Sequence, residues 1–264
     1  MSKLSDWLGG AGKVAVKAGG AIGRKIADGY GAIDPDVMRH LLQVPLLSYS
    51  LFVSRSEDIE AGEPDGYSPL IFVHGLGSHG GEFLLLSRYL RMMGRKRSYA
   101  IRFDDDQSVV EKAAALARFI RDVKKATGEA QVEVVAHSLG GVVARLAIAN
   151  HRLGTSVQTL ITLGSPHNGT YPARFGATSD LLDLRPDSEL MEKLNSRPWP
   201  KNVRGVTFWS RNDLLILPAE SAAMEGTEQV DTTPFTHYSY LLDPRSWVAV
   251  ARALDGPAQS SSSP

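Results

Sequence analysis

Short apolar runs alternate with helix-periodic segments through the middle of the chain. The apolar runs are rich in β-branched residues and too short for helices, which is typical of buried strands. The helical segments carry apolar residues at a spacing of three or four positions, most regularly between Val109 and Thr127. This alternation predicts an α/β fold: a mostly parallel central sheet with helices on both faces. The expected strands are 70–73, 98–103, 132–135, 157–163 and 203–209, and the expected helices are 82–93, 109–127, 141–150 and 244–254.

The pattern divides the chain into an N-terminal region, one large folded domain and a tail. Residues 61–255 are expected to form one domain, since α/β folds of this size commonly hold together around one sheet. Within it, residues 171–200 break the alternation, and two interpretations stay open: a lid over the site or an ordinary pair of connecting helices. Residues 256–264 are rich in serine and predict a disordered tail.

Residues 1–60 combine a Gly/Ala-rich amphipathic arm with a helical segment that begins at Asp34. The arm, residues 1–32, holds five basic and two acidic residues. It predicts either an interfacial helix on anionic lipid or, because of its many glycines, a loose arm packed on the domain surface. No secretory signal pattern and no apolar run of about 18 residues is found, so the expected location is cytoplasmic, with peripheral contact to the inner membrane face under the first interpretation.

The composition argues against nucleic-acid partners and excludes any chemistry that needs cysteine. The 264 residues carry 29 basic and 29 acidic side chains, so net charge offers no case for nucleic-acid binding. There is no cysteine, which excludes disulfides, thiolate zinc sites and a cysteine nucleophile. The glycine-rich turn at residues 74–81 has neither G-K-[ST] nor the spacing of G-x-G-x-x-G, so it matches neither of these two phosphate-binding motifs. Oligomeric state is not encoded in these features.

One stretch, Val134 to Gly141, runs from an apolar strand through a small-residue turn into a helix. A serine at such a junction, here Ser138, occupies a nucleophile elbow. The flanking positions must be small because the strand and the helix pack closely beside a strained turn, and they are Ala136 and Gly140.

A serine hydroxyl attacks an ester only when a histidine takes its proton and a carboxylate orients that histidine. Ser138, Asp213 and His237 supply these groups in the chain order expected of this fold. Each follows a predicted strand closely, so all three should reach the carboxyl edge of the sheet. The chief rival acid is Asp231, and Asp213 is preferred because it follows a cleaner strand.

The remaining histidines are assigned other roles. His137 adjoins the nucleophile, so its side chain should point away from the Ser138 hydroxyl. We expect turn, loop, structural or helical positions for the others, which are His74, His79, His167, His40 and His151. The oxyanion donors are expected to be the main-chain N–H groups of Leu76, in the glycine-rich turn, and Leu139, directly after the nucleophile.

The motifs V-H-G-L-G, A-H-S-L-G-G, G-S-P-H-N-G-T, S-R-N-D and T-H-Y stand in this order along the chain. With them, residues 65 to 255 resemble the α/β-hydrolase superfamily, and within it the bacterial triacylglycerol lipase and esterase group. The resemblance implies carboxylic-ester hydrolysis through an acyl-serine intermediate, without a cofactor. Some relatives bind a structural calcium or zinc ion; no counterpart of those ligands is found, and Asp243 is better explained as a helix cap.

The predicted function is therefore a serine ester hydrolase, an esterase or lipase in lipid metabolism, that acts on acyl or lipid esters. The same triad serves acyltransferases, phospholipases and thioesterases, and the motif does not specify the acceptor or the leaving group. A third alternative is a non-catalytic binding module on this fold, which fluorophosphonate labelling of the serine would distinguish.

Overall fold

The computed structural model describes residues 59–78, 81–104 and 106–256. Within these ranges one six-stranded sheet runs in the order β2-β1-β3-β4-β5-β6, and every neighbouring pair is parallel. All carboxyl ends therefore meet at one edge, as the alternating pattern predicted. The strands are β1 (Leu70–Val73), β2 (Ser98–Ala100), β3 (Val132–His137), β4 (Val157–Leu163), β5 (Arg204–Trp209) and β6 (Glu228–Asp231).

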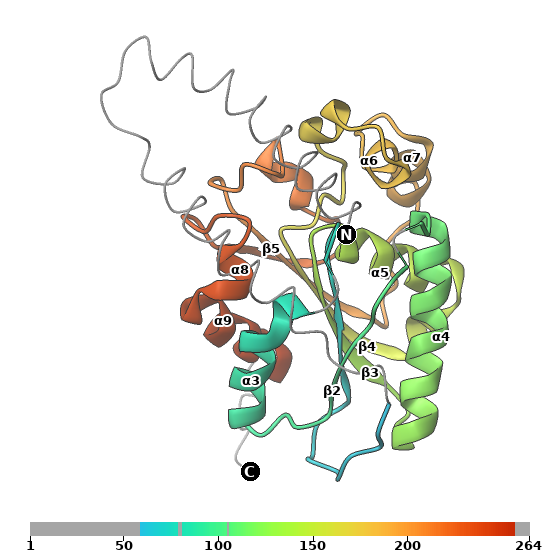
Figure 1. Cartoon of the computed structure of the whole chain (residues 1–264), viewed down its shortest axis with the longest axis vertical. Coiled ribbons are helices and arrows are strands. Elements are labelled where there is room, and N and C mark those ends of the chain that lie inside the picture. The colour runs from blue at the N-terminus through green and yellow to red at the C-terminus, as the bar shows by residue number, and fades with distance from the viewer. Residues whose placement is uncertain (1–58, 79–80, 105, 257–264) are drawn as a thin grey trace, which may run out of the picture.

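Helices cover both faces of this sheet (Figure 1). α4 and α5 pack together on one face, whereas α3, α8 and α9 pack on the other. The helices are α3 (Leu84–Met92), α4 (Val109–Thr127), α5 (Leu139–Asn150), α6 (Ser179–Asp183), α7 (Glu189–Asn195), α8 (Ser239–Leu242) and α9 (Pro244–Asp255).

α4, the longest helix among the described residues, has defined signals at both ends. Ser108 caps its start: the Ser108 hydroxyl accepts the Glu111 N–H at 3.3 Å, and the Glu111 carboxylate accepts the Ser108 N–H at 2.8 Å. This reciprocal capping box satisfies two donors that the first turn leaves unpaired. Gly128 ends the helix with φ at 73°, the left-handed conformation that glycine adopts without a Cβ clash.

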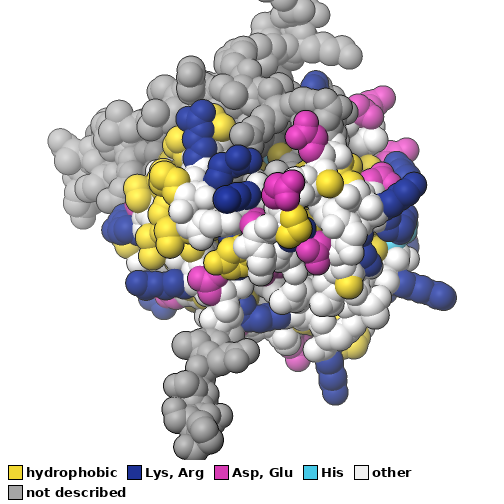
Figure 2. Space-filling view, turned by 90° about the horizontal axis from the view of Figure 1, so that it is seen from below, with side chains coloured by type: hydrophobic (Ala, Val, Ile, Leu, Met, Phe, Trp, Pro, Cys, Tyr) yellow, Lys and Arg dark blue, Asp and Glu magenta, His cyan; other side chains and the backbone are white. Residues whose placement is uncertain are grey.

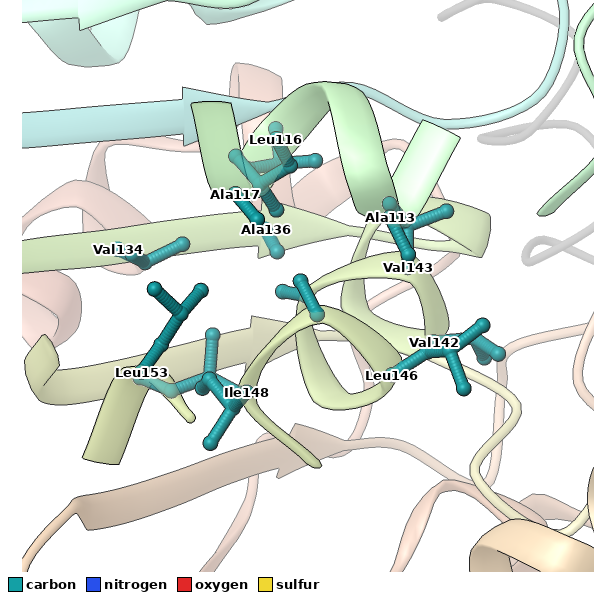
Figure 3. Packing of buried hydrophobic residues seen from close by; sticks show 14 of the residues in the cluster. Ala113, Leu116, Ala117, Val134, Ala136, Val142, Val143, Leu146, Ile148 and Leu153 are labelled. Atoms are coloured by element: carbon teal, nitrogen blue, oxygen red, sulfur yellow. The ribbon is translucent and has the colours of Figure 1, made fainter. Parts of the chain in front are cut away.

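The core lies in two layers, because successive strand residues face opposite sides. In β1, Ile71 and Val73 face the layer under α4 and α5, and Leu70 and Phe72 face the layer under α3 and α9. Figure 3 shows the first layer from close by, where side chains of α4 and α5 meet those of β3. Small residues such as Ala136 let these elements approach closely, which brings the start of α5 tight against the sheet.

Several segments differ from the expected elements. α8 was not predicted, and α5 begins at Leu139, two positions before its expected start. β6 was not predicted; its sequence, Glu-Gln-Val-Asp, is mostly exposed at the sheet edge and lacks an apolar pattern. β2 ends at Ala100, earlier than expected. The irregular segment 171–200 folds as a 3-10 helix (Tyr171–Phe175), α6 and α7, which leaves both the lid and the connecting-helix interpretations open.

The predicted arm at residues 1–32, the helix from Asp34, and residues 257–264 of the tail lie outside the described residues. In the part that is described, no helix combines the length and the apolar character needed to cross a membrane. Figure 2 shows basic and acidic side chains interspersed over one face of the molecule, in keeping with the balanced charge.

Candidate active site

Ser138 lies in a strained turn between β3 and α5. Its φ and ψ are 54° and −127°, a conformation that side-chain-bearing residues rarely adopt. The small residues after it are required by the packing: a Cβ on Gly140 would lie 2.4 Å from the Val73 carbonyl oxygen, and one on Gly141 would lie 2.1 Å from the Ser165 hydroxyl. The close packing of β1, β3 and α5 around the turn keeps the Ser138 backbone in this strained conformation.

Asp213 and His237 form a buried pair that reaches this edge from β5 and β6. The His237 Nδ1–H donates to the Asp213 carboxylate, with distances of 2.8 Å to Oδ2 and 3.1 Å to Oδ1. Oδ1 also accepts the N–H groups of Leu215 and Ile216, at 3.0 and 3.2 Å. The side chains are only 2% and 3% exposed. These bonds orient the carboxylate and select the tautomer of His237 whose Nε2 is free to accept a proton.

The three residues proposed as a triad follow three different strands. Ser138 directly follows β3, while Asp213 and His237 lie in the segments after β5 and β6. Asp231 is placed elsewhere: it is exposed, and its carboxylate accepts from the N–H and hydroxyl of Thr233. Asp213, not Asp231, is thus the acid that contacts His237.

The glycine-rich turn after β1 packs directly against the elbow. A Cβ on Gly75 would lie 3.0 Å from Cβ of Ser138, so a side chain here would crowd the serine. Leu76, the next residue, exposes 39% of its surface, and Leu139 follows Ser138 directly as the first residue of α5. Leu139 therefore adjoins Ser138 in sequence, and Leu76 follows the turn residue that packs against it.

His74 and His167 take structural positions. The His74 Nδ1–H donates to the Gly75 carbonyl at 2.9 Å, and its Nε2 accepts the Phe103 N–H at 3.4 Å, which ties the turn to the next segment. His167 is fully buried with its Nε2 3.0 Å from the Thr162 hydroxyl. Burial lowers the pKa of His167 to about 3, so this ring is neutral at physiological pH. His151 follows α5 as its C-cap residue, and His40 and His79 lie outside the described residues.

A buried carboxylate beside the site, Glu82, was missed by the sequence analysis. It lies in the 3-10 helix Gly81–Phe83, and its Oε1 is 3.2 Å from Nδ1 of His137. His137 does point away from the elbow surface, into this interior contact. The only sequence signal was an acidic residue directly after the glycine-rich turn, and acidic residues are common on exposed helix starts.

Metal binding finds no support among the residues that the structure describes, where no group of three or more His, Asp or Glu side chains could hold an ion. Asp243 is the N-cap of α9 and accepts the N–H of Arg245 at 2.9 Å. The helix-cap interpretation of Asp243 is thereby confirmed.

Apolar side chains are exposed in the segments next to the site. The loop after Asp213 packs against the loop after β4, where the Tyr171 N–H donates to the Leu217 carbonyl at 2.9 Å. Tyr171, Leu215 and Leu217 expose 55%, 40% and 37% of their surfaces. With Leu76, they place apolar surface around the carboxyl edge of the sheet.

The parallel sheet covered on both faces, with a strained serine turn after a central strand, defines an α/β-hydrolase. The sequence profile of one family, lipase (class 2), matches residues 67–240, more than half of the chain. The chain belongs to this family of lipases, and the predicted membership of the lipase and esterase group is confirmed.

Solved structures of lipases share the fold. Aspergillus fumigatus lipase B superposes with a TM-score of 0.66 at 18% identity, covering 76% of this chain and 55% of that one. The mature form of Bacillus licheniformis lipase BlEst2 superposes with a TM-score of 0.63 at 18% identity, covering 74% of this chain and 94% of that one. At such identities the likeness establishes the fold alone, which confirms the predicted fold class.

A curated relative matches over part of its length. The GPI inositol-deacylase of Eremothecium gossypii is 30% identical over 142 residues, which are 50% of this chain and 13% of that protein. The chain thus matches only a small part of that relative. Family and fold together support ester hydrolysis in general terms.

Proposed function

We propose that the protein is a serine ester hydrolase that cleaves acyl or lipid esters through an acyl-serine intermediate. The observation that carries this proposal is the buried Asp213–His237 pair, which lies at the same sheet edge as the strained Ser138 elbow. A binding module would have no need of an aligned carboxylate–imidazole pair beside a strained serine.

In the proposed mechanism the Ser138 hydroxyl oxygen attacks the ester carbonyl carbon while Nε2 of His237 accepts its proton. The Asp213 carboxylate accepts the hydrogen bond from the Nδ1–H of His237 and stabilises the imidazolium that forms. The N–H groups of Leu76 and Leu139 stabilise the negative oxygen of the tetrahedral intermediate. His237 then protonates the departing alcohol. Water, deprotonated by the same histidine, attacks the acyl-serine, and the acid and free serine are released.

The exposed apolar residues favour an acyl substrate with a hydrocarbon chain. Leu76 is part of the proposed oxyanion turn, and Leu215 and Leu217 lie two and four positions after Asp213, in the segment that follows β5. Burying such surface against an acyl chain contributes roughly 25 cal/mol per Å². Acyltransferase, phospholipase and thioesterase activities remain the alternatives, since they differ in acceptor and leaving group and not in the triad.

The test is hydrolysis of p-nitrophenyl esters from acetate to palmitate by the intact protein and by Ser138→Ala, with fluorophosphonate labelling alongside. We expect loss of both hydrolysis and labelling in Ser138→Ala, with an unchanged circular dichroism spectrum. Ser196→Ala, an exposed serine after α7, is the matched control and should keep both. An intact protein that neither labels nor hydrolyses esters, thioesters or amides would refute the proposal in favour of a binding role.

We also propose that the protein is cytoplasmic and that residues 1–32 contact the membrane surface. Flotation with anionic liposomes, comparing the intact chain with one that lacks residues 1–32, tests the contact. The interfacial interpretation expects the shortened chain to lose flotation, whereas equal flotation of both chains favours an arm packed on the domain.

A further inference from the structure

Glu82 and His137 form a second buried pair of a carboxylate and an imidazole, next to His237 of the proposed triad. Their side chains are 4% and 2% exposed, and Glu82 Oε1 is 3.2 Å from His137 Nδ1. On its other side, Nε2 of His137 is 3.1 Å from the main-chain carbonyl oxygen of His237. The ring centroids of His137 and His237 are 4.7 Å apart, so the second pair packs directly against the histidine proposed as the base.

The contacts of His137 determine its protonation. Both ring nitrogens face groups that can only accept, a carboxylate oxygen and a carbonyl oxygen. A neutral imidazole has one N–H, so one nitrogen lone pair would face an acceptor; the imidazolium has two donors and satisfies both partners. The electrostatics agree: burial lowers the pKa of His137, but the Glu82 carboxylate, the His237 carbonyl and the Asp213 carboxylate together outweigh burial, and the pKa is raised.

Glu82 also contacts the proposed oxyanion turn. The same atom, Oε1, accepts the N–H of Gly75 at 3.2 Å. Gly75 lies against Ser138 and precedes Leu76, one of the two proposed oxyanion residues. The Glu82 carboxylate thus fixes the turn after β1 and, through His137, the backbone of His237 in the segment after β6.

We propose that Glu82 and the imidazolium of His137 are positioning residues. They fix the positions of His237 and of the oxyanion turn relative to Ser138. This inference rests on the serine mechanism proposed above. The pair acts through the His237 carbonyl and the Gly75 N–H. The other titratable groups that face it are His74 in the turn after β1, Asp213, and Tyr238, whose ring centroid is 6.4 Å from that of His137.

The protonation state is tested first, by NMR of the full chain labelled with ¹⁵N-histidine at pH 7.5. At this pH an ordinary histidine, with a pKa of about 6.5, is mostly neutral. We expect one ring with both nitrogens protonated, and the loss of this signal in His137→Asn assigns it. A neutral His137 in the wild-type protein overturns the proposal, and this experiment does not depend on any enzymatic activity.

The positioning role is tested with Glu82→Gln, whose neutral amide cannot compensate a buried imidazolium, so that His137 becomes neutral. The atom that contacts both Gly75 and His137 is then either a carbonyl oxygen or an amide NH₂ group. In either orientation the Gly75 N–H, the His137 ring and the His237 carbonyl cannot all keep their partners, and one contact of the network is lost. We expect kcat per fluorophosphonate-reactive serine to fall about tenfold, the effect of losing one hydrogen bond to a charged group, while KM changes less than about threefold.

The matched control is Glu133→Gln. Glu133 is a similarly buried acid on β3 that pairs with Arg95 at the far end of the strand from Ser138. The Glu133→Gln variant should have a lower melting temperature than the wild-type protein and an unchanged kcat per reactive serine. The positioning role is overturned if Glu82→Gln keeps the wild-type kcat, or if both variants lower kcat equally. Should the wild-type protein hydrolyse no ester, the proposed function fails, and the NMR experiment still decides the state of His137.

Discussion

At the scale of single residues, the carboxylate of Asp213 receives three hydrogen bonds within the interior. The His237 Nδ1–H and the N–H groups of Leu215 and Ile216 all donate to it. The two main-chain donors fix the direction of the carboxylate before any substrate binds. Its contribution to the proposed catalysis is therefore orientation and charge, and an amide in its place would present the wrong hydrogen to the imidazole.

Asp213→Asn is expected to lower kcat by about ten-thousand-fold, because the amide stabilises the tautomer of His237 that cannot take the serine proton. The measurement is hydrolysis of the preferred p-nitrophenyl ester by the purified variant. Asp231→Asn is the matched control: its carboxylate is exposed, contacts Thr233 and not His237, and should leave kcat unchanged. Equal losses in the two variants would show that the acid of the triad is assigned wrongly.

At the scale of elements, a buried ion pair ties α6 to α4. Lys112 Nζ lies 2.8 Å from Oδ2 of Asp180, and the two side chains are 7% and 9% exposed. α6 belongs to segment 171–200, for which a lid remained one interpretation. Opening α6 away from the domain would break this contact. The ion pair therefore ties α6 to the core through α4.

Lys112→Met is expected to lower the free energy of unfolding by about 3–5 kcal/mol, since it leaves the Asp180 carboxylate buried without its partner. It should also speed hydrogen exchange in α6 more than in α9. Urea unfolding and exchange measured by mass spectrometry check the two effects. Lys193→Met on α7 removes an exposed partner of Glu189 and serves as the control, with no measurable change expected. A stable Lys112→Met variant with unchanged exchange would argue that α6 is not held by this pair.

At the scale of the whole molecule, Asp65, in the segment before β1, contributes to the dependence of stability on pH. Burial raises the pKa of Asp65, but the N–H groups of Arg97, Lys96 and Tyr67 and the Arg97 guanidinium together lower it below its usual value. A group whose pKa is depressed by folding stabilises the protein above its unfolded pKa. This stabilisation is lost as the pH falls through the folded value.

Asp65→Asn should therefore unfold more easily than the wild-type protein at pH 7, because the carboxylate contacts to residues 96 and 97 are weakened. The difference should shrink below about pH 4, where the wild-type carboxyl also begins to be protonated. Urea unfolding at pH 7, 5 and 3 measures it. A difference that stays constant over this range would mean that the charge of Asp65 does not contribute.

The elements that could be predicted best from sequence were those with a strong periodic pattern. α4 matches its predicted bounds because a cap, an apolar stripe and a terminal glycine agree on them. β6 was missed because an exposed edge strand needs no apolar alternation, and its place is set by pairing with β5. Segment 171–200 could not be assigned because its short helices depend on contacts with distant residues, such as Asp180 with Lys112.

The sequence by itself determined the order along the chain of the first five strands and of the four longer helices, the serine turn with its small neighbours, and the chain order of the three proposed catalytic residues. These follow from local periodicity and from steric limits within a few positions of one another. Only the tertiary structure decided that Asp213 and not Asp231 contacts His237, and that Glu82 joins His137 behind them. Glu82 and His137 are 55 positions apart, and Asp213 and His237 are 24 apart. Whether such side chains meet depends on how the strands pair and how the loops pack, which no local pattern encodes.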